Sequence, residues 1–307
     1  FAAGCDSAGD ALPEGKSPED IIKAGLLMQD EITQSVFEMK VDADLKGTVD
    51  GEDNALKGKM QISGTTDTVD KKMQIAFNID GKMNEDSGKA NLEVRVNSDG
   101  VFAKVDKVTV SGKKSVTRVD LYLADYVGSW IKASFVTADD IMSDSTGYTG
   151  VAYDEGEELP FKDIEYVGTK DILGVKSYQF HATVDESLIL DTMQAAGESD
   201  ADAKKFFDAA KMEGDVYVAV DKGAFTGFEG TMDLNDPEMN GHVALSLFIN
   251  PTKSDDVKTP SYDKELTEDD IAALMFGGAA PMGDGTGLGA EKIYCSSHES
   301  FAHFSPY

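Results

Sequence analysis

Few residues in this chain carry obvious chemistry. A thiol and two imidazoles lie close together in the last part of the sequence, at Cys295, His298 and His303. Thiolate and imidazole together suit zinc or copper. A closed structural zinc site takes four ligands, and this segment offers three. We therefore expect no metal site in this chain.

The other two histidines do not belong to a recognisable catalytic set. His181 stands in a strand-like segment, in opposite phase to Tyr178 and Phe180, and His242 opens a later strand. Both are expected at the surface. The sequence has no G-x-S-x-G, no H-E-x-x-H and no glycine-rich phosphate loop behind a strand. We therefore expect a protein that is not an enzyme and that needs no cofactor.

The chain is strongly acidic, with 28 basic and 57 acidic residues among 307 and a formal net charge of −29. Phosphate groups are repelled by such a charge, which excludes nucleic acid as a partner and disfavours anionic lipid head groups. The favoured interpretation of this negative charge is a solvated surface, and the alternative is cation binding. The acidic clusters at residues 50–54, 233–236 and 283–285 lack EF-hand spacing. They are typical of turns, and calcium there would be adventitious.

One cysteine follows small residues directly, in the sequence Phe1-Ala2-Ala3-Gly4-Cys5. Signal peptidases need such an unobstructed backbone before the cut. The segment is similar to the end of a bacterial lipoprotein signal peptide, the lipobox, although Ala2 stands where that family usually has Leu. The resemblance implies that Cys5 is acylated, that residues 1–16 are a lipobox remnant and tether, and that the protein is extracytoplasmic and membrane-anchored. The alternatives are a chance cysteine and a disulfide to Cys295.

A helix and a long series of strands follow this segment. Ser17, Pro18 and Asp20 form a capping box, which starts a helix that we expect to reach about Gln34. Its apolar stripe is Ile21, Ala24, Leu27, Met28 and Ile32. Alternation with a period of two then predicts strands near 37–45, 60–62, 73–79, 92–96, 101–105, 119–123, 129–135, 161–167, 175–184, 216–220, 225–234 and 243–249. Further helices are expected from Thr137, near 185–196, near 200–212 and from Thr267 to Met275.

This order predicts the α+β class, with one large curved antiparallel sheet and helices packed on its concave, dry face. So many strands would curl rather than stay flat, which gives a half-open β-barrel. We expect one domain over residues 17–276 and a glycine-rich, flexible C-terminal tail over 277–307. No apolar run approaches the ~20 residues of a membrane-spanning helix, so attachment to a membrane would need a lipid or a protein.

The order of elements resembles the LolA-like/LppX–LprG-like superfamily of extracytoplasmic lipid-carrying proteins. The segments that carry the resemblance are the N-terminal helix before residues 35–39, and residues 128–132, 174–180 and 216–223. The resemblance implies an apolar cavity that holds a lipid or a lipoprotein acyl chain, in a monomer without catalysis.

The apolar residues expected to line such a cavity are Leu27, Met28, Phe37, Met39, Met60, Met73, Phe77, Leu121 and Trp130. Twelve methionines suit flexible acyl chains, because the Met side chain adapts its shape. The alternation that turns apolar side chains toward the interior is the same whether that interior holds a cavity or is filled by side chains. The alternative is therefore a surface structural or interaction lipoprotein with a filled barrel and no ligand.

Overall fold

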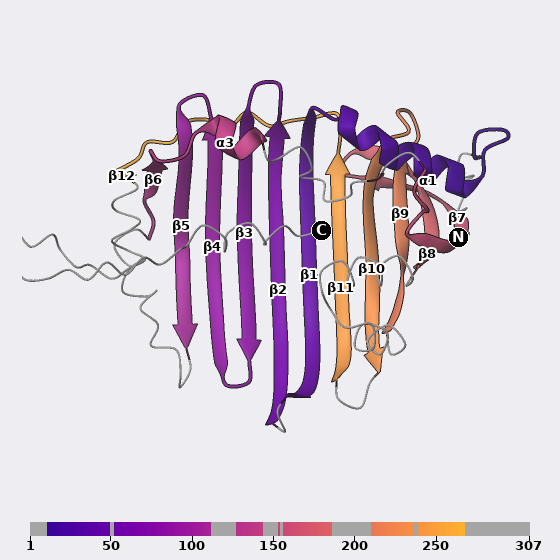
Figure 1. Cartoon of the computed structure of the whole chain (residues 1–307), viewed down its shortest axis with the longest axis horizontal. Coiled ribbons are helices and arrows are strands. Elements are labelled where there is room, and N and C mark those ends of the chain that lie inside the picture. Colours follow the sequence, from indigo (N-terminus) through magenta and orange to yellow (C-terminus); the bar gives the residue numbers. More distant parts are fainter. Residues whose placement is uncertain are drawn as a thin grey trace, which may run out of the picture.

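Twelve strands form one open sheet in the part of the chain that the computed structural model describes, residues 11–49, 52–111, 127–143, 153, 156–185, 210–235 and 239–267. The central strand is β1 (Gln34–Val49) (Figure 1). On one side of it lie β2 (Glu52–Asp67), β3 (Lys72–Met83), β4 (Asp86–Asn97), β5 (Gly100–Ser111), β6 (Trp130–Ala133) and β12 (Lys264–Leu266). On the other side lie β11 (Met239–Asn250), β10 (Phe225–Asn235), β9 (Ala210–Ala219), β8 (Val175–Val184) and β7 (Phe161–Ile172).

Neighbouring strands of the sheet are antiparallel, apart from the edge pair β6 and β12. The expected α+β class with a large, curved antiparallel sheet is therefore confirmed. Short connections join β1 to β5 in chain order, β7 to β8, and β9 to β11, as the spacing of the strands predicts. The pairing of β1 with β11 joins the two halves and links residues about 200 positions apart. No local signal in the sequence predicts this pairing.

One expected helix is wrong at its end, and others lie outside the described residues. Residues 210–212 were expected to close a helix but begin β9. The reason is the alternation of Ala210, Met212 and Val216, which continues with a period of two on the apolar face of the sheet. The strand expected at 119–123, most of the helices expected near 185–196 and 200–212, and the last helix and tail from 268 onward lie outside the described residues.

The first helix, α1 (Pro18–Leu27), begins at the expected capping box. The backbone N–H of Asp20 donates to Ser17 Oγ at 3.1 Å, and the backbone N–H of Ser17 donates to Asp20 Oδ2 at 3.1 Å. The helix ends earlier than expected. A 3₁₀ turn, η1 (Met28–Glu31), follows it and leads into extended backbone at Ile32.

The buried face of α1 differs from the predicted stripe. The buried residues are Ile21, Ile22, Gly25 and Leu26, whereas Leu27 is 40% exposed. Ala24 is exposed as well. The reason is close packing on the sheet, because a Cβ on Gly25 would lie 3.1 Å from both Val218 Cγ1 and the carbonyl oxygen of Gly223. This contact turns Ile22 and Leu26, four residues apart, toward the sheet.

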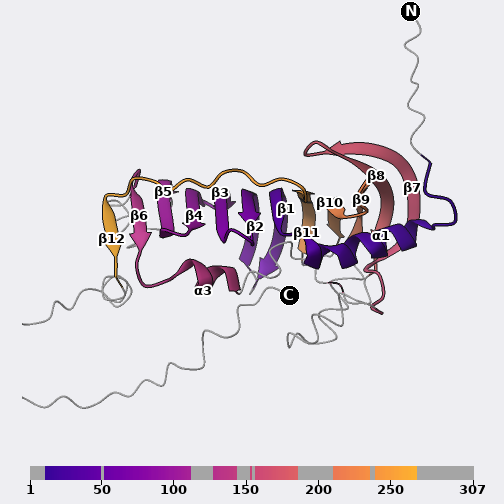
Figure 2. The same cartoon turned by 90° about the horizontal axis from the view of Figure 1, so that it is seen from above.

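The two α-helices of the described residues lie on the same face of the sheet and cover two separate apolar clusters (Figure 2). Under α1, residues of β8–β11 form the larger cluster, which includes Ile22, Leu26, Tyr178, Phe180, Val216, Val218, Phe225 and Ile249. The short helix α3 (Ala138–Ser143) covers the smaller cluster, which consists of Met73, Ile75, Val96, Val101 and Met142. Phe37 on β1 packs against both clusters. The middle of this face therefore lies between two covered areas.

The segment that connects β11 to β12 crosses the opposite face of the sheet, near the turns (Figure 2). The backbone N–H of Asp255 donates to Thr65 Oγ1 at 2.9 Å, and Arg95 Nη1 donates to the carbonyl oxygen of Lys258 at 3.3 Å. Val257 is buried within this segment, and Tyr262 packs against Phe102 with ring centroids 5.6 Å apart. This connection holds β12 beside β6, at the edge of the sheet.

Candidate functional site

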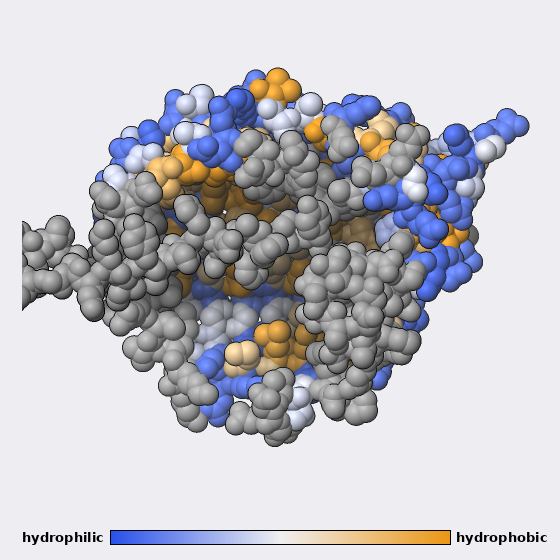
Figure 3. Space-filling view, viewed as in Figure 1, coloured by the Kyte–Doolittle hydropathy of each residue, from blue (hydrophilic) through white to orange (hydrophobic). Residues whose placement is uncertain are grey.

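The central apolar band is the part of the helix-bearing face that lies between the two covered clusters. Its two registered rows come from β11, β1, β2 and β3 and consist of Leu247, Met39, Ile62 and Phe77, and of Leu245, Val41, Met60 and Ile79. Leu245 is 37% exposed and Ile79 is 40% exposed, whereas Val216 and Val96 under the helices are fully buried. Figure 3, viewed from the helix side, shows apolar residues on the floor of this recessed face. The band is therefore apolar surface that no helix of the described chain covers.

Small residues border the band. The next row on the same face consists of Ala43, Gly58, Gly81 and Gly88. A Cβ on Gly58 would lie 3.9 Å from its nearest neighbour, so nearby side chains do not fill the space above this glycine. The face is consequently deeper along this row than along the band.

The structure brings together only part of the expected cavity set. Met39, Met60 and Phe77 lie in the central apolar band. Phe37 and Met73 lie next to it on the same face, and Met73 is buried in the cluster under α3. These five residues share one side of the sheet.

The other expected lining residues lie elsewhere. Leu27 is exposed at the end of α1, and Met28 lies near Gly223 in the turn after β9. Trp130 lies on the opposite face, because it pairs in register with Lys104 and has the guanidinium of Arg95 4.6 Å from its ring. Leu121 and Cys5 lie outside the described residues.

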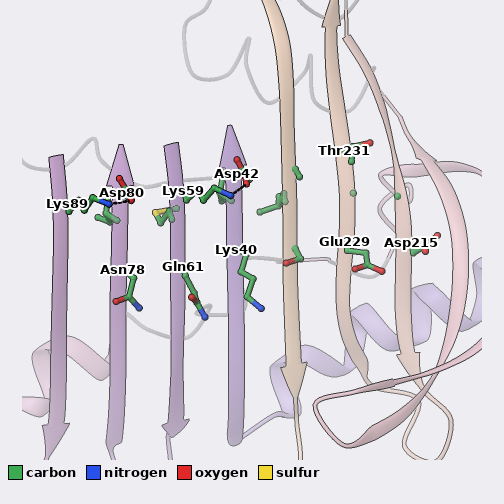
Figure 4. Close-up of a pocket in the computed structure, with 18 of the residues that line it drawn as sticks. Lys40, Asp42, Lys59, Gln61, Asn78, Asp80, Lys89, Asp215, Glu229 and Thr231 are labelled. Atoms are coloured by element: carbon green, nitrogen blue, oxygen red, sulfur yellow. Dashed lines mark hydrogen bonds and ion pairs between the residues drawn. The ribbon is translucent and has the colours of Figure 1, made fainter. Parts of the chain in front are cut away.

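A second candidate site, the polar groove, lies on the face opposite the helices and has a volume of about 850 Å³. Its floor is one registered row across nine strands. The row consists of Lys107, Asn91, Asn78, Gln61 and Lys40, followed by Ser246, Glu229, Asp215 and His181. Figure 4 shows Lys40, Gln61 and Asn78 on one side and Glu229 and Asp215 on the other. No expectation from the sequence included this row as a site.

Charge is divided along the polar groove. The half formed by β1–β5 contains Lys40, Lys59, Lys89 and Lys107 with only Asp42 and Asp80. Lys59 pairs with Asp42 at 2.7 Å, and Lys89 pairs with Asp80 at 2.5 Å. The hydrogen bond to Asp42 raises the pKa of Lys59. The half formed by β8–β10 contains Glu213, Asp215 and Glu229 with His181, and β11 contributes Ala244 and Ser246 between the two halves.

The acidic half is held in place by short polar contacts. Gln179 Nε2 donates to Asp215 Oδ2 at 2.6 Å, and His181 Nδ1 lies 3.0 Å from Asp215 Oδ1. His181 is exposed, as expected, although its carboxylate partner comes from a different strand. His242 is exposed as well, and its Nδ1 lies 2.6 Å from Asp233 Oδ1. Neither contact forms a nucleophile–base pair.

A buried tyrosine lies at the end of the acidic half. The Tyr217 hydroxyl donates to Glu229 Oε1, and Lys170 Nζ donates to the same hydroxyl at 3.0 Å. Lys170 Nζ also pairs with Glu229 at 2.5 Å and lies 4.9 Å from the centroid of the Tyr217 ring. Burial, followed by the hydrogen bond to Glu229, raises the pKa of Tyr217 far above its usual value. The phenol therefore stays protonated in the folded protein.

We expect the stability of the protein to fall as the pH rises through about 10, the ordinary pKa of a phenol. The unfolded chain ionises Tyr217 there and the folded chain does not, so alkali favours unfolding. Tyr217→Phe removes this difference. Urea midpoints measured between about pH 8 and about pH 11 should decline less steeply in Tyr217→Phe than in the wild type. Identical slopes would contradict the protonated, buried phenol.

Neither a membrane-spanning helix nor a metal-binding group emerges from the described residues. No helix among them is both long and apolar enough to cross a membrane. No group of three or more His, Cys, Asp or Glu among them is arranged to hold a metal ion. Cys295, His298 and His303 lie outside the described part of the chain.

Comparisons with known proteins give only distant structural likenesses. No protein-family model matches this chain, and no curated protein matches it. The solved structure of the lipoprotein LppX from Mycobacterium tuberculosis matches with a TM-score of 0.30 and 12% identity, over 78% of this chain and 96% of that chain. A DUF1329-family protein from Desulfovibrio piger matches with a TM-score of 0.19 and 9% identity, over 76% of this chain and 93% of that one. Likenesses at this level carry no inference about the function of this chain.

Proposed function

We propose that this chain is a non-catalytic binding protein that holds the acyl chain of a lipid or lipoprotein on the central apolar band. The single observation that carries the proposal is the exposure of that band. Its residues Leu245 and Ile79 are 37% and 40% exposed in the middle of a sheet whose flanking clusters are buried. Contiguous exposed apolar surface on a folded protein is typical of an interaction site.

The shape and composition of the band suit an acyl chain. Its rows cross four strands, which stand about 4.8 Å apart, so the band is an elongated strip rather than a point. The glycine row beside it leaves depth for a chain to lie in. Met39 and Met60 can adjust to a flexible ligand. Each methylene that leaves water contributes about 0.8 kcal/mol, so a long chain binds without any polar contact.

The proposal includes a location. Phe1-Ala2-Ala3-Gly4-Cys5 is the segment that supports it, since an acylated Cys5 would hold the protein outside the cell at a membrane surface. A single acyl chain binds a membrane weakly, and a second lipid or a protein contact strengthens the attachment. We propose a monomer, and the intact mass of the mature N-terminus tests acylation of Cys5 against a disulfide to Cys295.

The test is native mass spectrometry of the full chain, purified mildly and incubated with a long-chain fatty acid. We expect the wild type to retain one lipid. Met60→Glu should retain at least roughly tenfold less, because it places a charge under the acyl chain. Gln61→Glu is the matched control, since it adds the same charge one residue along β2, on the other face. It should bind lipid as the wild type does.

Two outcomes would overturn the proposal. The first is that no preparation retains lipid, which would instead favour a structural or interaction protein with a dry face. The second is that Met60→Glu and Gln61→Glu retain equal amounts, because a ligand on the central apolar band must distinguish the two faces of β2.

A further inference from the structure

The polar groove places charges of opposite sign at two ends of one row. Lys40 pairs with Glu38, Glu213 with Lys211, and Glu229 with Lys170. With these partners counted, its β1–β5 half keeps one lysine in excess and its β8–β10 half keeps one carboxylate in excess, in a chain whose formal net charge is −29. Between them, β11 contributes no charged residue, since its lining residues are Ala244, Leu245 and Ser246. A molecule that lies along the row therefore meets positive potential at one end and negative potential at the other.

The register of the sheet sets the distance between these charges. Lys40 and Glu229 lie in the same row with one strand, β11, between them, so their strands are roughly 10 Å apart. In the next row, Lys59 and Glu213 lie on strands that are roughly 19 Å apart. An extended peptide spans about 3.3 Å per residue, so three to six residues cover roughly this range. The two charges of a phospholipid head group lie too close together to reach both halves.

The floor of the polar groove also offers free hydrogen-bonding groups. Within the part of the chain that the structure describes, the side chains of Gln61, Asn78 and Asn91 have no hydrogen-bond partner. A carboxamide both donates and accepts, as a peptide group does. The groove volume of about 850 Å³ is of the size that accommodates small ligands.

From these observations we propose that the polar groove binds a short peptide with free termini. Its carboxylate lies at the lysines of the β1–β5 half and its ammonium group at Asp215 and Glu229. The peptide groups between them bond to the carboxamides of the floor. This site is separate from the central apolar band, because the two lie on opposite faces of the sheet.

The test is isothermal titration of the full chain with tetra-alanine, whose termini are free. We expect saturable binding that weakens roughly tenfold or more when the N-terminus is acetylated or the C-terminus is amidated, since each change removes one charge-assisted contact. Dialanine and glycerophosphocholine, whose charges are closer together, should bind more weakly than tetra-alanine. Added salt should weaken the binding of tetra-alanine, because the charges are exposed.

Matched variants locate the site. Lys40→Gln and Asp215→Asn should each weaken binding of tetra-alanine roughly tenfold, and Glu213→Gln provides a second acidic variant if Asp215→Asn fails to fold. Lys23→Gln is the control, because Lys23 is exposed on α1 and lies outside the polar groove. It should bind as the wild type does.

Four results would overturn this proposal: no saturable binding, affinity that does not change when the termini are blocked, tighter binding of glycerophosphocholine than of tetra-alanine, or equal losses in Lys40→Gln and Lys23→Gln. None of them bears on lipid retention, because the lipid test changes Met60 on the other face.

Discussion

Leu26→Ala should lower the free energy of unfolding by about 3 kcal/mol, since this substitution empties part of the core under α1. Leu26 is 1% exposed and belongs to the cluster that joins α1 to β8–β11. The docking of this helix defines one border of the central apolar band. Urea unfolding followed by the fluorescence of Trp130, the single tryptophan, measures the change.

The neighbouring residue supplies the control. Leu27 has the same side chain on the same helix but is 40% exposed. Leu27→Ala should therefore change the free energy of unfolding by less than about 0.5 kcal/mol. Equal effects of the two substitutions would mean that α1 does not dock as the structure shows. The stripe predicted from the sequence, which contains Ala24 and Leu27, would then be the better description of the buried face of the helix.

Gly214→Ala should lower the free energy of unfolding by about 3 kcal/mol, because the new methyl group has no room. Its Cβ would lie 2.3 Å from the carbonyl oxygen of Glu229 and 2.7 Å from Gly230 Cα. The ring of Phe228 lies over these two paired glycines, with its Cε2 atom 2.9 Å from the same Cβ. Backbone atoms surround the site, so β9 and β10 would have to separate.

Gly58→Ala tests whether the crowding, rather than the loss of glycine in a strand, causes the effect. Gly58 lies in β2 with a negative φ, and its Cβ would meet nothing closer than 3.9 Å. We expect this substitution to leave stability unchanged or to raise it by up to about 1 kcal/mol. A loss as large as that in Gly214→Ala would show that the close approach at Gly214 is not what destabilises the protein.

The sequence predicted local structure well where residues close together in the chain determine it. The capping box at Ser17 and Asp20 was predictable because its hydrogen bonds span three residues. The alternation from Phe37 to Leu45 predicted a strand with one dry face, and β1 is that strand. The end of α1 was not predictable, because the contact of Gly25 with β9 comes from a strand almost two hundred residues later.

The candidate sites were less predictable, since they depend on strand pairing. Alternation placed Met39 and Met60 on a dry face, yet it could not place Trp130, whose face follows from pairing with Lys104 on β5. The polar groove was missed entirely. Lys40 and Glu229 are ordinary surface residues in the sequence and become ends of one site only when β1 pairs with β11 and β11 with β10. Such non-local pairing leaves no periodic signal.

Photo-crosslinking with a fatty acid that carries a diazirine near its methyl end is the most direct test of the central claim. After irradiation of the full chain, peptide mapping should find the label on residues of the central apolar band, such as Met60, Ile62 and Leu247. Excess unlabelled fatty acid should remove that label. Labelling that is confined to the polar groove, or that excess fatty acid does not reduce, would contradict acyl binding on this face.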